Sequence, residues 1–136
     1  MHTRILMSAS AAFLAMLGLA ALFLPQELLI YAGSSPAGFP LLVIQVSGAL
    51  YLGFANLNWM ARGVLIGGIY SRPLAMGNFL HFSIVTIVLA KTLSATTLFP
   101  LVACGIAYAI FAVWFGLVMF THPLADTSGD AKGLGK

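Results

Sequence analysis

Six polar side chains within long apolar stretches are the residues of this chain best suited to chemistry. They are amides, a phenol and an imidazole: Gln45, Tyr51, Asn56, Asn58, Asn78 and His81. In hydrocarbon such groups need a hydrogen-bond partner, because no water is available there. The set predicts either structural hydrogen bonds between helices or a polar pocket for the head group of a ligand. A proton relay is a third alternative, but the apolar stretches offer it no acidic partner.

Helical spacing sorts the polar residues of the stretch 39–61 onto two faces. Gln45 and Asn56 are eleven residues apart, which is close to three turns of an α-helix, so they share one face. Tyr51, Asn58 and Arg62 follow at spacings of seven and four and share another face. At least one of these faces is expected to meet another helix or a wet cavity.

The next apolar stretch offers partners for these amides. Asn78 and His81 are three residues apart and lie on adjoining sectors of a helix. If the two stretches are antiparallel neighbours, Asn58 and Asn78 lie at similar depths. We therefore predict that Asn56 and Asn58 meet Asn78 and His81.

Two arginines, Arg62 and Arg72, bracket an apolar, glycine-rich link that includes Gly67 and Gly68. A guanidinium forms two-pronged hydrogen bonds with phosphate or carboxylate, so the pair predicts a contact with an anion or a head group. The plainer alternative is that both arginines set the topology and touch anionic lipid. The link itself is expected at the membrane interface or folded back against the helices.

The sequence contains no recognisable catalytic or metal-binding motif. No nucleophile–base pair is visible, no cluster of His, Cys, Asp and Glu has metal-ligand spacing, and the single cysteine, Cys104, cannot form an intrachain disulfide. The histidines at 2 and 122 are expected near the inner surface, too far from His81 to ligate one haem. We predict no cofactor, no metal and no nucleic-acid partner, and favour a non-enzymatic role. A membrane enzyme that depends on a second chain stays open.

The elements that position these residues are four apolar segments. The chain is 61% hydrophobic and 7% charged, its mean hydropathy is +1.05, and a span needs about 20 apolar residues. The segments are 5–24, 39–61, 74–93 and 98–120. The sequence predicts an all-α polytopic membrane protein: one four-helix transmembrane bundle over residues 1–123 and a mobile cytoplasmic tail over 124–136. We expect the first segment to be retained as a span rather than cleaved as a signal peptide, because it is long and lacks a small-residue cleavage site.

Charge placement predicts the orientation. Of the six basic residues, only Lys91, near the end of the third span, falls on the opposite side of the membrane. The other five lie at the two ends of the chain or in the link between the second and third spans. By the positive-inside rule, both termini and that link are cytoplasmic.

Prolines and small residues predict helix starts and packing. Pro40, Pro73 and Pro100 lie where three spans begin, Pro25 can open a short helix, and Thr96 and Thr97 are candidate caps. Small residues predict close helix packing on two spans: Ala49 and Gly53 on one, and Ala103, Gly105, Ala107, Ala109, Ala112 and Gly116 on the other.

Several short motifs carry a family resemblance. They are Leu24 to Leu29 after the first span, Asn58 to Gly63, Gly67 to Tyr70, Arg72-Pro73, and Asn78 with His81. Over residues 4–123 the chain resembles a group of small uncharacterised bacterial four-span membrane proteins, and more loosely DoxX-like proteins. The resemblance implies a multi-pass protein of the bacterial inner membrane and, through the association of DoxX-like proteins with respiratory complexes, an accessory subunit. It lends no catalytic residues.

Two functions follow as hypotheses. The first is a membrane protein that binds a lipid-like or small amphipathic ligand, or serves as accessory subunit of a membrane complex with a protein partner. The alternative is a small dimeric transporter. Proton-coupled export is disfavoured, because the only acidic residue near a span, Glu27, lies at its edge.

Overall fold

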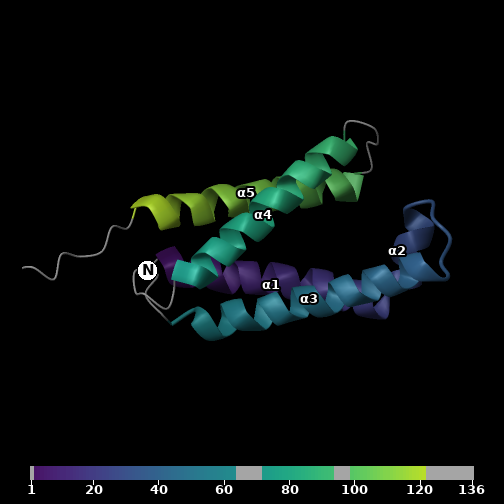
Figure 1. The fold of residues 1–136 in the computed structure, drawn as a ribbon, viewed down its shortest axis with the longest axis horizontal. Coiled ribbons are helices and arrows are strands. Elements are labelled where there is room, and N and C mark those ends of the chain that lie inside the picture. The colour runs from purple at the N-terminus through teal and green to yellow at the C-terminus, as the bar shows by residue number, and fades with distance from the viewer. Residues whose placement is uncertain (1, 64–71, 94–98, 122–136) are drawn as a thin grey trace, which may run out of the picture. The chain divides into compact units, whose positions relative to one another are not determined.

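The computed structural model describes residues 2–63, 72–93 and 99–121, all of whose regular elements are helices (Figure 1). In chain order they are α1 (His2–Phe23), α2 (Pro25–Tyr31), α3 (Phe39–Ala61), α4 (Arg72–Leu93) and α5 (Phe99–Thr121). The long helices α1, α3, α4 and α5 each have the length and hydropathy of a membrane span. The predicted fold class is confirmed: the protein is an all-α polytopic membrane protein.

Proline placement explains where several helices begin. Pro25 and Pro40 occupy the first turns of α2 and α3, and Pro73 and Pro100 are the second residues of α4 and α5. The first-turn N–H groups of a helix have no intrahelical acceptor, so proline loses nothing there. The predicted starts and the short helix at Pro25 are confirmed. Thr96, Thr97, most of the link (64–71) and the predicted tail (124–136) lie outside the described residues.

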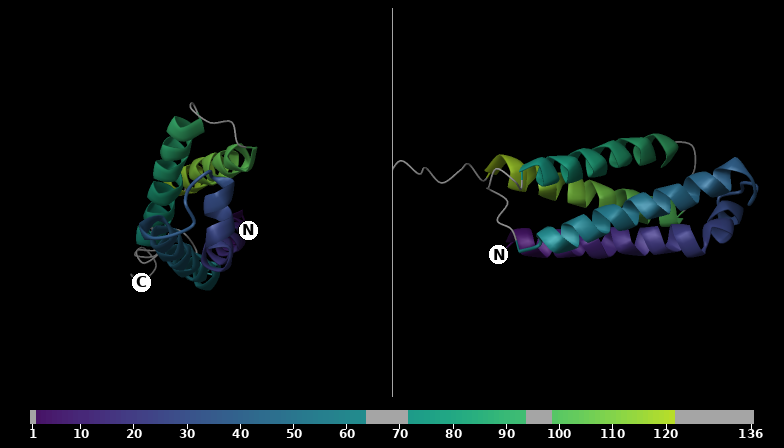
Figure 2. Two further views of the ribbon diagram at one scale, coloured as in Figure 1. Left: turned by 90° about the vertical axis from the view of Figure 1, so that its right-hand side faces the viewer. Right: turned by 60° about the horizontal axis from the view of Figure 1, so that its bottom comes forward.

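The chain divides into two compact units, residues 1–64 and 65–136, and each is described by itself. In the first unit α1 packs along α3, and α2 lies at the far end of this pair (Figures 1 and 2). In the second unit α4 packs along α5. The prediction of a single domain over 1–123 stays a prediction, as does the orientation of the termini.

Two glycines allow α1 and α3 to approach closely. A Cβ on Gly18 would lie 2.9 Å from the carbonyl oxygen of Gly48, and a Cβ on Gly48 would lie 3.0 Å from that of Gly18. Backbone atoms cannot move aside as a side-chain tip can, so no larger residue fits at this crossing. The small pair predicted on this span, Ala49 and Gly53, is exposed instead, and a side chain at Gly53 would meet nothing within 4 Å.

Small residues of α5 make room for side chains of α4, as predicted. A Cβ on Gly105 would lie 3.2 Å from Leu93, and one on Gly116 would lie 3.1 Å from the ring of Phe79. Ala112, between them, is buried. Helix contact in this unit therefore uses one of the small-residue surfaces that the sequence offers.

Large apolar side chains cover much of the remaining helix surface. Phe39 is 76% exposed, Phe99 81% and Val113 63%. In water such a surface would be strongly unfavourable, whereas lipid tails are as apolar as the side chains themselves. The exposed faces are those expected of helices that use a bilayer as solvent.

Candidate functional site

The six predicted polar residues differ in burial. Asn58 and Asn78 are 0% exposed. Gln45, Tyr51 and His81 are half-buried, and Asn56 is exposed. Asn56 and Asn58 thus lie on different faces of α3, in agreement with the spacing argument.

The buried amide of Asn58 joins α3 to α1. Its Nδ2 donates a hydrogen bond of 3.0 Å to Oγ of Ser10, which is itself 0% exposed. The Ser10 hydroxyl in turn donates to the carbonyl oxygen of Met7 at 3.1 Å. The chain of two bonds gives the amide an acceptor inside the helix pair, which supports a structural role for Asn58.

Asn78 is satisfied partly within its own helix. Its Nδ2 donates to the carbonyl oxygen of Leu74, one turn earlier in α4, at 3.0 Å. Thr86 donates in the same way to the carbonyl oxygen of Phe82 at 2.7 Å. Such bonds to the preceding turn let polar side chains reside in apolar helices without water.

His81 lies beside an aromatic cluster between α4 and α5. Its ring centroid is 5.3 Å from that of Phe82 and 5.8 Å from that of Tyr108. Phe82 is fully buried and also contacts Phe111 at 5.0 Å and Phe115 at 5.6 Å. The imidazole therefore packs against aromatic rings of its own unit, which the sequence reasoning did not anticipate. Its predicted contact with the amides stays a prediction.

The predicted pocket of six polar residues is distributed over both units. Gln45, Tyr51, Asn56 and Asn58 belong to α3, whereas Asn78 and His81 belong to α4. That these two groups meet stays a prediction. Within the first unit, the buried partner of Asn58 is Ser10, a residue that the sequence reasoning missed. One feature of the sequence could have indicated Ser10. It is a hydroxyl residue in an alanine-rich span, and it lies at the same depth as Asn58 if the two helices are antiparallel.

A cationic groove lies at the end of the first unit where α1 begins and α3 ends. It is lined by Arg4, Trp59, Met60, Arg62 and Gly63. The Arg62 guanidinium carbon lies 3.7 Å from the centroid of the Trp59 ring, a cation–π contact. Arg62 also donates from Nη1 to the carbonyl oxygen of Trp59 at 3.1 Å. The groove thus combines two guanidinium groups with an indole and a thioether.

The position of Arg62 follows from local helix chemistry. It is the C-cap residue of α3, and its backbone N–H also points to the Trp59 carbonyl. The last carbonyls of a helix lack intrahelical donors, and the helix dipole favours a cation at this end. The guanidinium is therefore held in place by the helix end as well as by the indole ring.

The second arginine of the predicted anion contact, Arg72, is exposed at the first residue of α4. It belongs to the other unit, so its pairing with Arg62 stays a prediction. Arg4, which the sequence analysis used only for orientation, shares the groove with Arg62 instead. The sequence does not show that these two arginines are neighbours, because they are far apart in the chain. They come together only through the packing of α1 on α3.

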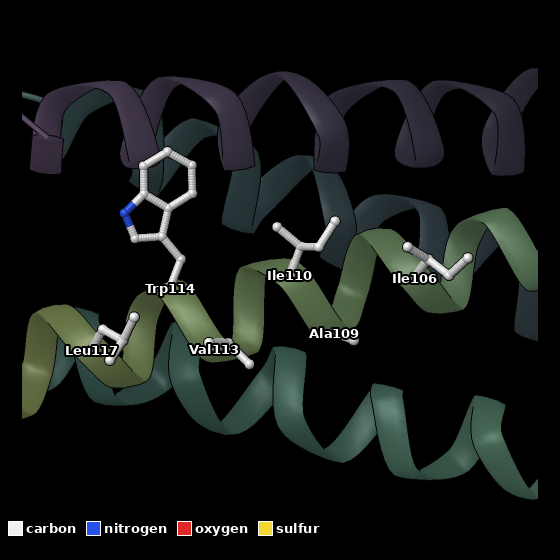
Figure 3. Close-up of a pocket in the computed structure, with 6 residues that line it drawn as sticks. All are labelled: Ile106, Ala109, Ile110, Val113, Trp114 and Leu117. Atoms are coloured by element: carbon white, nitrogen blue, oxygen red, sulfur yellow. The ribbon is translucent and has the colours of Figure 1, made fainter.

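A second hollow runs along α5 and is entirely apolar in character (Figure 3). Six side chains line it, of which Trp114 is the largest: Ile106, Ala109, Ile110, Val113, Trp114 and Leu117. Their spacing of three and four residues places them along the length of one helix. The hollow offers an acyl chain or an apolar side chain a surface, but its lining contains no charged side chain that would recognise a head group.

No group of three or more His, Cys, Asp or Glu residues capable of holding a metal ion occurs within residues 2–63, 72–93 and 99–121. Comparison with known proteins gave no further assignment: no family model, no curated protein and no solved structure matches this chain.

Proposed function

We propose that this multi-pass membrane protein binds a lipid-like or small amphipathic ligand taken from the bilayer, without catalysing a reaction on it. The observation that carries the proposal is the cationic groove formed by Arg4, Trp59, Met60, Arg62 and Gly63. In this groove two guanidinium groups border the apolar surface of the α1–α3 helix pair. An amphipathic molecule has the same division of polar and apolar parts.

The geometry of Trp59 supports this proposal. The indole is 52% exposed and stacks with Arg62 at the end of a span. Tryptophan at a membrane interface places its polar edge among head groups and its ring among acyl chains. The thioether of Met60, which is 73% exposed, adds a flexible apolar surface beside it.

We propose that the protein lies in the bacterial inner membrane with both termini in the cytoplasm. We further propose that it is related to small four-span membrane proteins, and more loosely to DoxX-like proteins. We also propose an accessory role in a membrane complex. Helix surfaces on both units present exposed apolar side chains that other helices in the membrane can contact. A membrane partner or a second copy of the chain can use these surfaces.

Native mass spectrometry of the protein released from lipid nanodiscs tests ligand binding. We expect the wild type to retain one lipid or amphipathic molecule at a defined ratio. Trp59→Ala should reduce this retention, whereas Phe39→Ala, which removes an exposed aromatic ring at the other end of α3, should leave it intact. A bare wild-type protein under conditions gentle enough to keep lipids on a control membrane protein would contradict the proposal.

The alternative of a small dimeric transporter stays a prediction from the sequence. Flux of a cationic or amphipathic dye into liposomes, with His81→Ala as the comparison, would test it. Unchanged flux in the variant would remove the imidazole from any transport mechanism.

A further inference from the structure

We infer that the ligand is an anionic glycerophospholipid and that Arg4 and Arg62 together bind its phosphate. The inference rests on the proposed function, because it names the chemical class of the ligand held by the same groove. It adds Arg4 as a specificity-determining residue and predicts selectivity between head groups.

The groove carries an excess of positive charge. Its lining contains two arginines and no carboxylate. Among the residues that the structure describes, the sole acidic side chain is Glu27, which lies in α2 at the far end of the α1–α3 pair (Figure 1). Neither guanidinium therefore has an internal counterion nearby in its own unit, and an anion from outside would neutralise them.

Arg62 is preorganised to bind an anion. Its guanidinium is already fixed by the Trp59 ring at 3.7 Å and by the Trp59 carbonyl oxygen at 3.1 Å. A guanidinium carries five N–H donors in a fixed planar fork, so one bond to the carbonyl leaves donors for a phosphate. Because the group is held before the ligand arrives, little rotamer freedom is lost on binding.

Arg4 is exposed in the first turn of α1. That turn contains no acidic side chain, although the positive end of a helix dipole favours an anion. A cation in this position is electrostatically unfavourable by itself. A phosphate bound between Arg4 and Arg62 would offset both the arginine charge and the helix dipole.

The apolar surface beside the groove favours a lipid over a soluble ion as the source of the phosphate. From the groove, the surface of α3 continues into exposed apolar side chains: Met60 is 73% exposed, Leu57 53% and Leu50 62%. A phosphate held at the arginines would place its acyl chains beside these residues. A free phosphate ion would make no use of the Trp59 and Met60 side chains.

The decisive experiment measures lipid selectivity in nanodiscs that contain equal amounts of phosphatidylglycerol and phosphatidylcholine. Bound lipids are counted by native mass spectrometry for the wild type and for Arg4→Gln, Arg62→Gln and Arg62→Lys. Lys91→Gln is the matched control, because it removes one positive charge from α4 outside the groove. Circular dichroism and gel filtration confirm that each variant is folded.

We expect the wild type to prefer phosphatidylglycerol by about tenfold or more. Both lipids carry a phosphate, but the choline of phosphatidylcholine adds a positive charge that the two guanidinium groups repel, and such a like-charge contact costs enough for a tenfold change in affinity. Arg4→Gln and Arg62→Gln should each remove most of this preference. Arg62→Lys should bind both lipids more weakly but keep part of the preference, because an ammonium keeps the charge but not the planar fork. Lys91→Gln should behave as the wild type.

Other outcomes separate the two proposals. Retention of lipid with equal preference for both head groups would overturn the anionic assignment while leaving ligand binding intact, and retention of no lipid would overturn both. Selectivity that survives Arg4→Gln would refute the paired clamp. Displacement of phosphatidylglycerol by inorganic phosphate added alone would show that a soluble anion, and not a lipid, is the ligand.

Discussion

At the scale of single residues, Asn56 and Asn58 show how two identical side chains acquire different roles. They are two positions apart on α3, which turns them to different sides of the helix. Asn58 is fully buried and donates to Ser10 on α1, whereas Asn56 is exposed. Helical periodicity was sufficient to separate them. It did not reveal Ser10, because the choice of partner depends on the register between two helices.

The Asn58–Ser10 hydrogen bond predicts an energetic coupling between α1 and α3. In a double-mutant cycle of Asn58→Ala and Ser10→Ala, the two losses of unfolding free energy should fail to add by about 0.6–1.7 kcal/mol, the range found for interhelical hydrogen bonds in membranes. The cycle is measured by denaturant unfolding in mixed micelles.

A matched cycle pairs Asn58→Ala with Ser47→Ala. The Ser47 hydroxyl bonds to the Val43 carbonyl of its own helix at 2.8 Å, so these two changes should add. Additive effects for Asn58 and Ser10 as well would show that their hydrogen bond contributes nothing to the packing of α1 on α3.

At the scale of helices, the crossing of α1 and α3 is determined by Gly18 and Gly48. The sequence analysis expected Ala49 and Gly53 to provide the contact on this span, because small residues four apart favour close approach. Several small residues satisfy that rule, and the rule does not say which of them faces the neighbour. The helix starts, in contrast, were predictable, because proline is favoured in the first turn of a helix whatever the helix packs against.

Alanine substitutions should have different effects on stability at Gly18, which lies in the α1–α3 contact, and at Gly53, which is exposed. Gly18→Ala places a methyl group 2.9 Å from the Gly48 carbonyl oxygen, so we expect a destabilisation of about 1–3 kcal/mol, the usual cost of overpacking. Gly53→Ala meets nothing within 4 Å and should be neutral or stabilising by up to about 1 kcal/mol, because alanine favours the helix. Unfolding in the same micelles measures both.

A loss of stability in Gly53→Ala comparable to that in Gly18→Ala would contradict this assignment of the contact. It would indicate instead that the Ala49–Gly53 surface is covered in the membrane, for example by a second copy of the chain. Cross-linking of the wild type at increasing ratios of lipid to protein would then identify the neighbour.

At the scale of the whole molecule, the predicted bounds of the four spans lie within three residues of the ends of the long helices. The cause is physical: the thickness of the hydrocarbon fixes the length of an apolar helix, so composition alone marks its bounds. The candidate site was less accessible. Arg62 was identified from its chemistry, but Arg4 enters the groove only through the packing of α1 on α3, which no local pattern encodes.

The distribution of charge also predicts how the molecule is oriented. A reporter fused after Lys136 should read as cytoplasmic, because five of the six basic residues lie at the ends of the chain or in its middle link. A fusion within the segment that follows Lys91 should read as external. Reversed signals from the two fusions would overturn the assigned topology and would place the cationic groove in the outer leaflet.

The central claim is that the long helices require lipid as their solvent, and detergent-free purification tests it most directly. Full-length protein reconstituted in nanodiscs should be helical and monodisperse, whereas removal of lipid and detergent should cause aggregation, as measured by circular dichroism and gel filtration. A folded, monodisperse species in plain buffer would contradict the account.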